Sequence, residues 1–196
     1  GRLSPEKNIE VLVEMMKVLR RDETADYRLL VAGAGPKEEW FKCAFEKDMS
    51  NALRMLGHIT DKQKLANLYA SCDVFVHPNP REPSGNGVLE AMASGAPVVA
   101  PNSGGILTYA NDDNAWLVPP TGENFANAVR EILTNEEKRK QKTVKAVQTA
   151  KENNREKILG EVFELYEKML NRFQAENEAF NYREKAKGFD FAAEIE

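Results

Sequence analysis

Two glutamates, Glu82 and Glu90, flank a glycine-rich segment and have seven residues between them. The segment reads Pro-Ser-Gly-Asn-Gly-Val-Leu, which is typical of a loop that leads into a helix. Free N–H groups at a helix N-terminus bind phosphate, and glycine lets a ligand approach the backbone closely. Carboxylates bind hydroxyl groups, as an acidic residue binds ribose in dinucleotide sites. The pattern favours a ligand with both phosphate and hydroxyl groups over an isolated pair of surface acids.

Two cations near the N-terminus, Arg2 and Lys7, are candidates to neutralise such a phosphate. Ser4 and Pro5 predict a helix start, with Ser4 as N-cap and Pro5 at the first helical position. Lys7 then falls in the first turn, where a cation opposes the helix dipole. A residue placed against local preference can have another task, such as binding an anion. The alternative is an exposed lysine paired with a nearby glutamate.

Other candidate residues lie at predicted strand ends. The glycine turn at 33–36 lacks the third glycine and the acidic residue of a dinucleotide site, which argues against classical NAD binding. His58 and His77 each follow a strand, and each is either a ligand contact or a structural residue. Two histidines without clustered aspartates predict no metal site. No serine has the histidine and acid partners of a hydrolase triad.

The composition excludes several classes of protein. The chain has 196 residues, of which 42% are hydrophobic and 30% charged, as in a globular protein with a real core. A net charge of −4 gives no electrostatic support for nucleic-acid binding. Cys43 and Cys72 lack metal-site spacing, which favours buried thiols in a reducing, cytoplasmic compartment. No apolar run reaches the length that spans a bilayer, and the first residue is not Met.

Apolar periodicity switches between strand and helix along residues 1–134. Strands that alternate with helices predict an α/β fold, a Rossmann-like parallel sheet with helices on both faces. Ligands of such sheets bind at the carboxyl ends of the strands, where the turns at Gly33 and Gly57 and the Glu82 loop gather. The predicted strands are 27–32, 52–56, 73–77, 97–100 and 115–118, and the predicted helices are 5–19, 36–49, 61–70, 85–94 and 123–133.

The chain changes character after residue 134. We expect residues 135–173 to form extra C-terminal helices that pack on the first domain, or on a part of the protein outside this chain. The stretch 138–157 is basic but lacks an apolar face, which favours a solvated helix over one that lies on an anionic membrane. The polar tail 174–196 is expected to be disordered or to dock on an absent domain.

The segment from Glu82 to Ala100 resembles the Glu-x7-Glu signature of GT4-type (glycosyltransferase group 1) retaining glycosyltransferases. The stretches 1–7, 31–36, 56–59 and 103–105 resemble further motifs of that family, in the same order along the chain. The resemblance covers about residues 1–133. It implies a GT-B enzyme, a hexosyltransferase in carbohydrate biosynthesis, of which this chain is the C-terminal, donor-binding domain.

The resemblance also implies roles for individual residues. A nucleoside-diphosphate sugar is the donor substrate, with no cofactor and no catalytic metal. Arg2, Lys7 and Glu82 are the expected catalytic residues, because they contact the leaving diphosphate or the donor sugar. Glu90 is expected to accept hydrogen bonds from the ribose. The expected donor-binding residues are Arg2, Lys7, Gly33, Gly57, His58, Glu82, Gly85, Asn86, Gly87 and Glu90.

Members of the family have a strand that runs into the position of Gly1 and an acceptor-binding domain before it. We therefore expect this chain to be a fragment that binds a nucleotide or nucleotide-sugar weakly and transfers nothing. The acceptor is a sugar, a lipid or another small molecule, and peripheral contact with the cytoplasmic face of a membrane stays open for the full protein. The alternatives are a scaffold domain without turnover and a related phosphorylase that uses inorganic phosphate.

Overall fold

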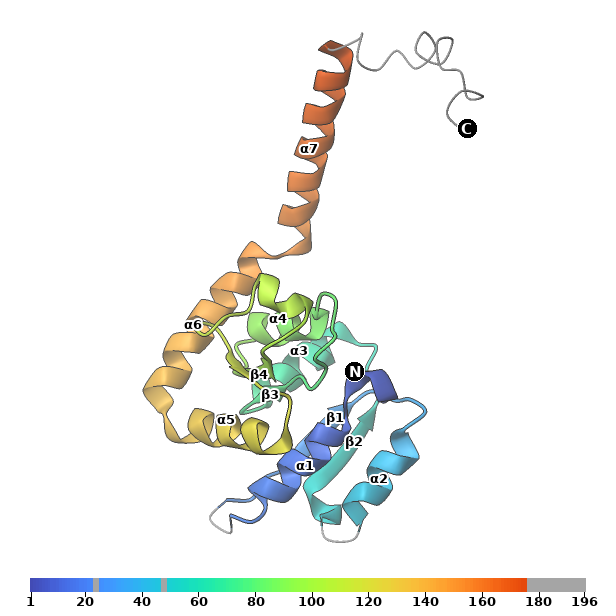
Figure 1. Cartoon of the computed structure of the whole chain (residues 1–196), viewed down its shortest axis with the longest axis vertical. Helices are drawn as coiled ribbons and strands as arrows, with labels where there is room; N and C mark the ends of the chain where they lie inside the picture. The colour runs from blue at the N-terminus through green and yellow to red at the C-terminus, as the bar shows by residue number, and fades with distance from the viewer. Residues whose placement is uncertain (23–24, 47–48, 176–196) are drawn as a thin grey trace, which may run out of the picture. The chain divides into compact units, whose positions relative to one another are not determined.

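The computed structural model describes residues 1–22, 25–46 and 49–175, which belong to two separate units (Figure 1). The first unit covers Gly1–Asn153 and has the predicted α/β architecture. The second unit begins at Asn154, and its described part consists of one long helix, α7 (Arg155–Ala175). The predicted tail at 174–196 lies, from residue 176 on, outside the described residues.

The strands of the first unit are parallel and short. The β1–β2 pair has Leu29 opposite Leu53, and Figure 1 shows α1 and α2 next to it. A second sheet has the order β3-β4-β5, with Val99 of β4 opposite Trp116 of β5. The strand bounds are β1 Leu29–Ala32, β2 Leu53–Gly57, β3 Phe75–Val76, β4 Val98–Pro101 and β5 Trp116–Val118.

Helices cover both faces of β4, whose side chains are all buried. Val99 packs into an apolar cluster with α1 and α5, whereas Val98 and Ala100 belong to a second cluster with α4 and α6. Because successive residues of a strand point to opposite faces, this division places a helical layer on each side of the sheet. The helix bounds are α1 Glu10–Leu19, α2 Glu38–Glu46, α3 Lys62–Ser71, α4 Asn86–Ala93, α5 Gly122–Thr134 and α6 Glu136–Glu152.

The five strands do not form one continuous sheet. Strands β1 and β3 are not paired with each other, and residues of both line one cavity. The amine of Gly1 donates a hydrogen bond to the carbonyl of Ala32, at the carboxyl end of β1. The N-terminal segment therefore lies next to the carboxyl end of β1.

The predicted helix start at Ser4 and Pro5 is wrong for α1. Pro5–Lys7 is a single 3-10 turn, η1, and Ser4 bonds to the Glu6 carboxylate instead of capping a helix. Asn8 then adopts a left-handed conformation with a φ of 53°, and its Nδ2 donates to the carbonyl of Pro78 at 3.1 Å. Because this turn ends η1, α1 begins only at Glu10, and the helix-dipole argument for Lys7 fails.

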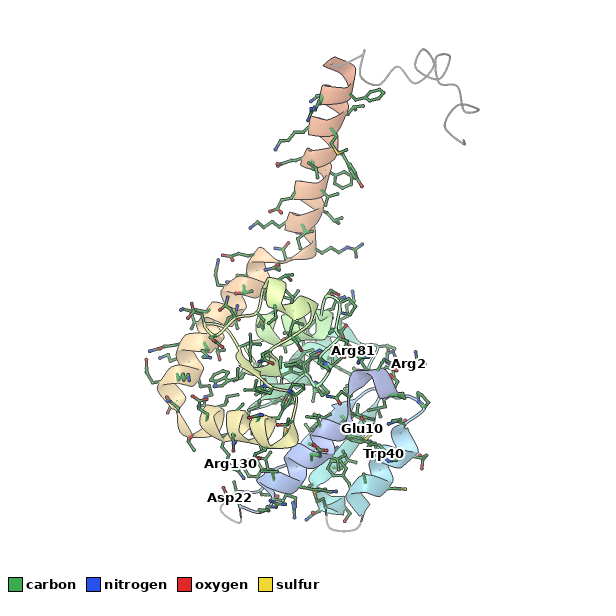
Figure 2. All side chains as sticks on the ribbon, in the orientation of Figure 1. Arg2, Glu10, Asp22, Trp40, Arg81 and Arg130 are labelled. Carbon is green, nitrogen blue, oxygen red and sulfur yellow. The ribbon has the colours of Figure 1, made fainter. Side chains whose placement is uncertain are left out.

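Polar side chains at the starts of α1, α2 and α3 form local contacts. Lys37 pairs with Glu10 of α1 and lies 4.9 Å from the centre of the Trp40 ring. Asp61 caps α3 as expected, because its carboxylate accepts from the N–H groups of Gln63 and Lys64. Figure 2 shows the side chains of Glu10 and Trp40 on α1 and α2.

Helix α6 packs on α4 and α5, and Lys142 anchors it to β5. The Lys142 Nζ donates to the carbonyl of Ala115 at 2.8 Å and lies 4.6 Å from the centre of the Trp116 ring. Burial lowers the pKa of Lys142, with Lys138 adding to the effect.

We expect Lys142→Met to destabilise the first unit by about 1–2 kcal/mol, because it removes a charged hydrogen bond and a cation–π contact while keeping the aliphatic stem. Urea unfolding followed by circular dichroism measures the change. The matched control is Lys140→Met, which replaces an exposed lysine on the same helix and should change the free energy of unfolding by less than about 0.5 kcal/mol. Equal losses in the two variants would contradict the anchoring role.

The second unit carries a long apolar surface on α7. Its exposed side chains include Phe163 at 63% and Tyr166 at 61% of their full accessibility. That this segment packs on the first domain stays a prediction. In the described ranges, no helix combines the length and the apolar character needed to cross a membrane.

Candidate functional site

A cavity of about 1190 Å³ opens at the carboxyl ends of β1 and β3. Its walls come from η1, the loops after β1, β2 and β3 and the start of α4, and they continue along β1 and β3 to side chains of α1, α3 and α5. Gly57 is absent from this lining, although His58 beside it is present. The predicted site residues that line the cavity are Arg2, Lys7, Gly33, His58, Glu82, Gly85, Asn86, Gly87 and Glu90.

The N-terminus of α4 is open toward this cavity. Gly85 has a left-handed conformation with a φ of 68°, and no side chain caps the helix. A Cβ at Gly85 would also lie 2.6 Å from a side-chain carbon of Ile106, so glycine is required there. Within the described ranges, the N–H groups of Asn86 and Gly87 have no hydrogen-bond acceptor. These donors, together with the helix dipole, make the first turn of α4 suited to an anion.

Glu82 and Lys7 form an ion pair at the same end of the cavity. The Lys7 Nζ lies 2.7 Å from Glu82 Oε2, which also accepts from the Asn79 Nδ2 at 2.9 Å. Partial burial raises the pKa of Glu82, but the hydrogen bonds from Lys7 and Asn79 outweigh burial and hold that pKa below its ordinary value. Glu82 is therefore charged near neutral pH. It pairs with Lys7, the cation that was predicted to contact a phosphate.

Arg2 is the second cation of the site. Its side chain is exposed, lines the cavity and has no ion-pair partner within the described part of the chain (Figure 2). Lys7, by contrast, is half-buried and already paired with Glu82. Arg2, Lys7 and the open helix terminus can together stabilise negative charge on a diphosphate.

Glu90 lies on α4, at a different part of the cavity wall. Its Oε2 accepts a hydrogen bond of 3.2 Å from the Tyr69 hydroxyl of α3. Burial and the neighbouring Glu90 raise the pKa of Tyr69 to about 12, so the hydroxyl stays a donor. Glu90 itself is exposed and keeps free acceptor capacity for further hydroxyl groups.

The segment Ser103–Gly105 supports the loop that carries Glu82. The Gly105 N–H donates to the Glu82 carbonyl at 2.8 Å, and the Ser103 hydroxyl donates to the Pro80 carbonyl at 3.2 Å. A Cβ on Gly105 would lie 1.7 Å from the Pro83 carbonyl oxygen, so the two backbones touch. From the other side, the Tyr109 hydroxyl donates to the Ser84 carbonyl at 2.8 Å.

The glycines of the turn after β1 are required by close packing of the N-terminal segment. A Cβ on Gly33 would lie 1.7 Å from the Gly1 carbonyl oxygen, and one on Gly35 would lie 2.2 Å from the Leu3 carbonyl oxygen. The N-terminal segment therefore packs directly on this turn and is held there by the bond from the Leu3 N–H to the Ala34 carbonyl, at 3.1 Å. The turn positions Arg2 as well as lining the cavity.

His77 directly follows β3 and lies close to Glu82. Only 13% of its side chain is exposed, and its Nε2 is buried without a hydrogen-bond partner, 4.0 Å from Glu82 Oε2. Burial lowers the pKa of His77, Glu82 opposes this, and Lys7 adds to the lowering. The ring is therefore neutral near pH 7.

Three residues of the site were not predicted from the sequence. Asn79 was detectable, because its Oδ1 accepts from the Arg81 N–H in the Asx turn that asparagine commonly forms. Tyr69 and Tyr109 gave no local signal, since each reaches the site from another element through its hydroxyl. Across the described ranges, no three His, Cys, Asp or Glu side chains converge in a way that could hold a metal ion.

Solved structures share the fold of this chain. The C-terminal domain of the group 1 glycosyl transferase LpcC of Francisella tularensis superposes with a TM-score of 0.68 at 22% identity, over 78% of this chain and 82% of that one. HepE of Anabaena, solved with UDP, superposes with a TM-score of 0.67 at 23% identity, over 76% of this chain and 42% of HepE. The likeness to LpcC confirms the predicted C-terminal half of a GT-B fold, and the likeness to HepE shows the same fold.

Sequence relatives agree with the structural matches. An uncharacterised glycosyltransferase of Methanocaldococcus jannaschii is 32% identical over 69% of this chain and 35% of its own length. A GDP-mannose-dependent phosphatidylinositol dimannoside mannosyltransferase of Mycobacterium tuberculosis is 30% identical over 72% of this chain and 36% of its own length. The chain thus spans about a third of these relatives. The family of glycosyl transferases group 1 matches residues 1–150, and the chain belongs to that family.

Proposed function

We propose that this chain is the donor-binding domain of a retaining glycosyltransferase, and that it holds a nucleoside-diphosphate sugar in the cavity at the start of α4. The observation that carries the proposal is the convergence of an uncapped helix N-terminus, two cations and two separated carboxylates on one cavity. Among relatives in the family, HepE binds UDP and one mannosyltransferase uses GDP-mannose. The proposed donor is therefore a nucleoside-diphosphate sugar.

The diphosphate end of the site lies at Arg2, Lys7 and the first turn of α4. Cleavage of the bond between sugar and phosphate builds negative charge on the leaving diphosphate. Donors and cations that already point at the diphosphate stabilise that charge without reorganisation. Glu82, beside Lys7, is placed to accept from hydroxyl groups of the donor sugar, and the acceptor attacks from the same face of the sugar that the diphosphate leaves.

The ribose end of the site is assigned to Glu90. We expect Glu90→Gln to weaken the binding of UDP or GDP about tenfold, since a hydrogen bond from a hydroxyl to a carboxylate contributes about 1.5–3 kcal/mol. The same substitution should leave the affinity for the 2′,3′-dideoxy nucleotide nearly unchanged, because that ligand lacks the hydroxyls. Isothermal titration calorimetry with the four protein–ligand pairs measures the difference.

Tyr69→Phe is the control for Glu90→Gln. It removes the hydroxyl that donates to Glu90 and leaves the carboxylate in place. Discrimination between the ribose and dideoxy ligands should survive in Tyr69→Phe. Equal losses for both ligands in Glu90→Gln would mean that the glutamate acts through the structure and not through the ribose.

Binding itself is the general test. Titration of the chain with UDP and GDP should give saturable binding to one of them, whereas a scaffold domain of the same fold would bind neither. We further expect no sugar transfer by the isolated chain, because in the proposed enzyme the acceptor is held by another domain. Measurable turnover with a defined acceptor would overturn that part of the proposal.

A further inference from the structure

The Glu82 carboxylate has two basic neighbours, and only one of them is bonded to it. Lys7 lies 2.7 Å from Glu82 Oε2, whereas the Nε2 of His77 lies 4.0 Å from the same oxygen without any partner. A buried polar atom without a hydrogen bond costs free energy, so such an atom at a ligand site requires an explanation.

The protonation of the His77 ring bears on the orphaned nitrogen. A neutral imidazole carries its proton on one nitrogen only, and Glu82 Oε2, at 4.0 Å from Nε2, is too far away to hold that proton at Nε2. In a neutral ring with Nδ1 as the donor, Nε2 carries a lone pair and no hydrogen. A lone pair and a carboxylate oxygen repel each other. Protonation of Nε2 would turn it into a donor toward Glu82.

Binding of a diphosphate changes which partners are left for the Glu82 carboxylate. In the empty site Lys7 pairs with Glu82, and a phosphate that binds beside Lys7 competes with Glu82 for that cation. Glu82 would then keep only the Asn79 amide as a partner, in a half-buried position close to a polyanion. A carboxylate left without its cation in such a position is costly.

Resting on the proposed function, we propose that His77 is a positioning residue that takes up a proton when a nucleoside-diphosphate sugar binds, and that it replaces Lys7 as the partner of Glu82. The proton comes from solvent, the N–H bond forms at Nε2, and no other bond changes. Lys7 is thereby released to the diphosphate, while Glu82 stays in position for the sugar.

The charges around the ring agree with this exchange. In the described part of the chain, three charged groups act on the pKa of His77: Glu82 on the loop after β3, Lys7 on η1 and the amine of Gly1. In the empty site, burial lowers the pKa of His77, Glu82 opposes that effect, and Lys7 and the amine reinforce it. Movement of Lys7 toward the ligand and the arrival of two negative phosphates both raise that pKa, so binding takes up protons.

The sign of the pH dependence follows from linkage. A group whose pKa rises on binding makes the ligand bind more tightly as the pH falls through the window between its free and bound pKa values. The ordinary pKa of histidine is about 6.5, and that of free His77 lies lower. The affinity for a nucleotide-sugar should therefore increase as the pH is lowered from about 8 toward about 6.

Calorimetry with UDP-glucose and GDP-mannose tests the proposal. These probes carry no phosphate monoester, whose second pKa of about 6 would contribute protons of its own. Titrations at pH 6.5 in buffers with different ionisation enthalpies give the number of protons taken up per ligand. The wild-type chain should show a binding enthalpy that depends on the buffer, with the sign of proton uptake.

Two histidine variants identify which residue takes up the proton. His77→Gln keeps a donor near Glu82 that does not titrate, so the uptake should vanish and the affinity should no longer depend on pH. His58→Gln, which removes the other histidine of the cavity, should keep the uptake. If His77→Gln fails to fold, NMR titration of the His77 ring in the wild-type chain, with and without ligand, measures the same pKa change.

A rise in the His77 pKa on binding, together with uptake that His77→Gln removes, supports the proposal. Binding with an enthalpy that is independent of the buffer, or uptake lost only in His58→Gln, overturns the proposal and leaves the proposed function intact. Binding of neither nucleotide-sugar overturns the proposed function and this inference with it.

Discussion

The substitution Gly105→Ala is expected to destabilise the first unit by about 3 kcal/mol and to weaken nucleotide-sugar binding about 100-fold. The reason is a backbone contact between two segments. The new Cβ would lie 1.7 Å from the carbonyl oxygen of Pro83, where no side chain can give way. The loop must shift, and it carries Glu82, whose carbonyl accepts the Gly105 N–H. Thermal unfolding and calorimetry measure the two effects.

The matched control is Gly160→Ala. Nothing lies within 4 Å of a Cβ at Gly160, which is part of α7. Alanine is about 0.5–1 kcal/mol more favourable than glycine in a helix, so this change should not weaken the chain and should leave binding intact. A Gly105→Ala chain that binds as tightly as the wild type would show that the loop at 82–84 does not depend on the segment after β4.

The parts of the site that are contiguous in the chain could be predicted from the sequence. Glu82, the glycines and Glu90 lie within nine residues, so a loop-to-helix pattern is enough to place both acids around one helix terminus. The carboxyl-end rule for parallel sheets predicted that the turns at Gly33 and Gly57 approach them. Gly33 lines the cavity, whereas in the second turn the lining includes His58 but not Gly57.

Contacts between distant segments could not be predicted. The ion pair between Lys7 and Glu82 joins residues 75 positions apart, and it depends on Asn8 ending the η1 turn. The helical period of residues 9–19 does not reveal such a left-handed residue. The sequence also does not reveal that β1 and β3 are unpaired, since each strand has a normal apolar pattern and pairs with a strand on its other side.

The second large effect is expected for Lys7→Met, which should weaken the binding of UDP or GDP about 100-fold and that of the free nucleoside hardly at all. The substitution removes a cation from the diphosphate, and it also leaves the negative charge of Glu82 without Lys7 beside it, close to the place where the phosphates bind. Arg2→Ala should show the same selectivity with a smaller loss, because Arg2 is exposed and screened by solvent. Calorimetry for the nucleotides and NMR titration for the nucleosides give the affinities.

A double variant separates the two causes of that loss. Glu82→Gln in the Lys7→Met background removes the repelling charge while keeping the shape of the side chain, so it should recover about tenfold of the lost affinity for the diphosphate. Lys17→Met, an exposed lysine of α1 outside the cavity lining, is the control for net charge and should bind normally. If Lys7→Met weakens nucleoside and nucleotide binding equally, Lys7 does not act on the phosphates. If the double variant recovers nothing, the loss comes from the missing cation alone, and the empty-site pair with Glu82 does not compete with the ligand.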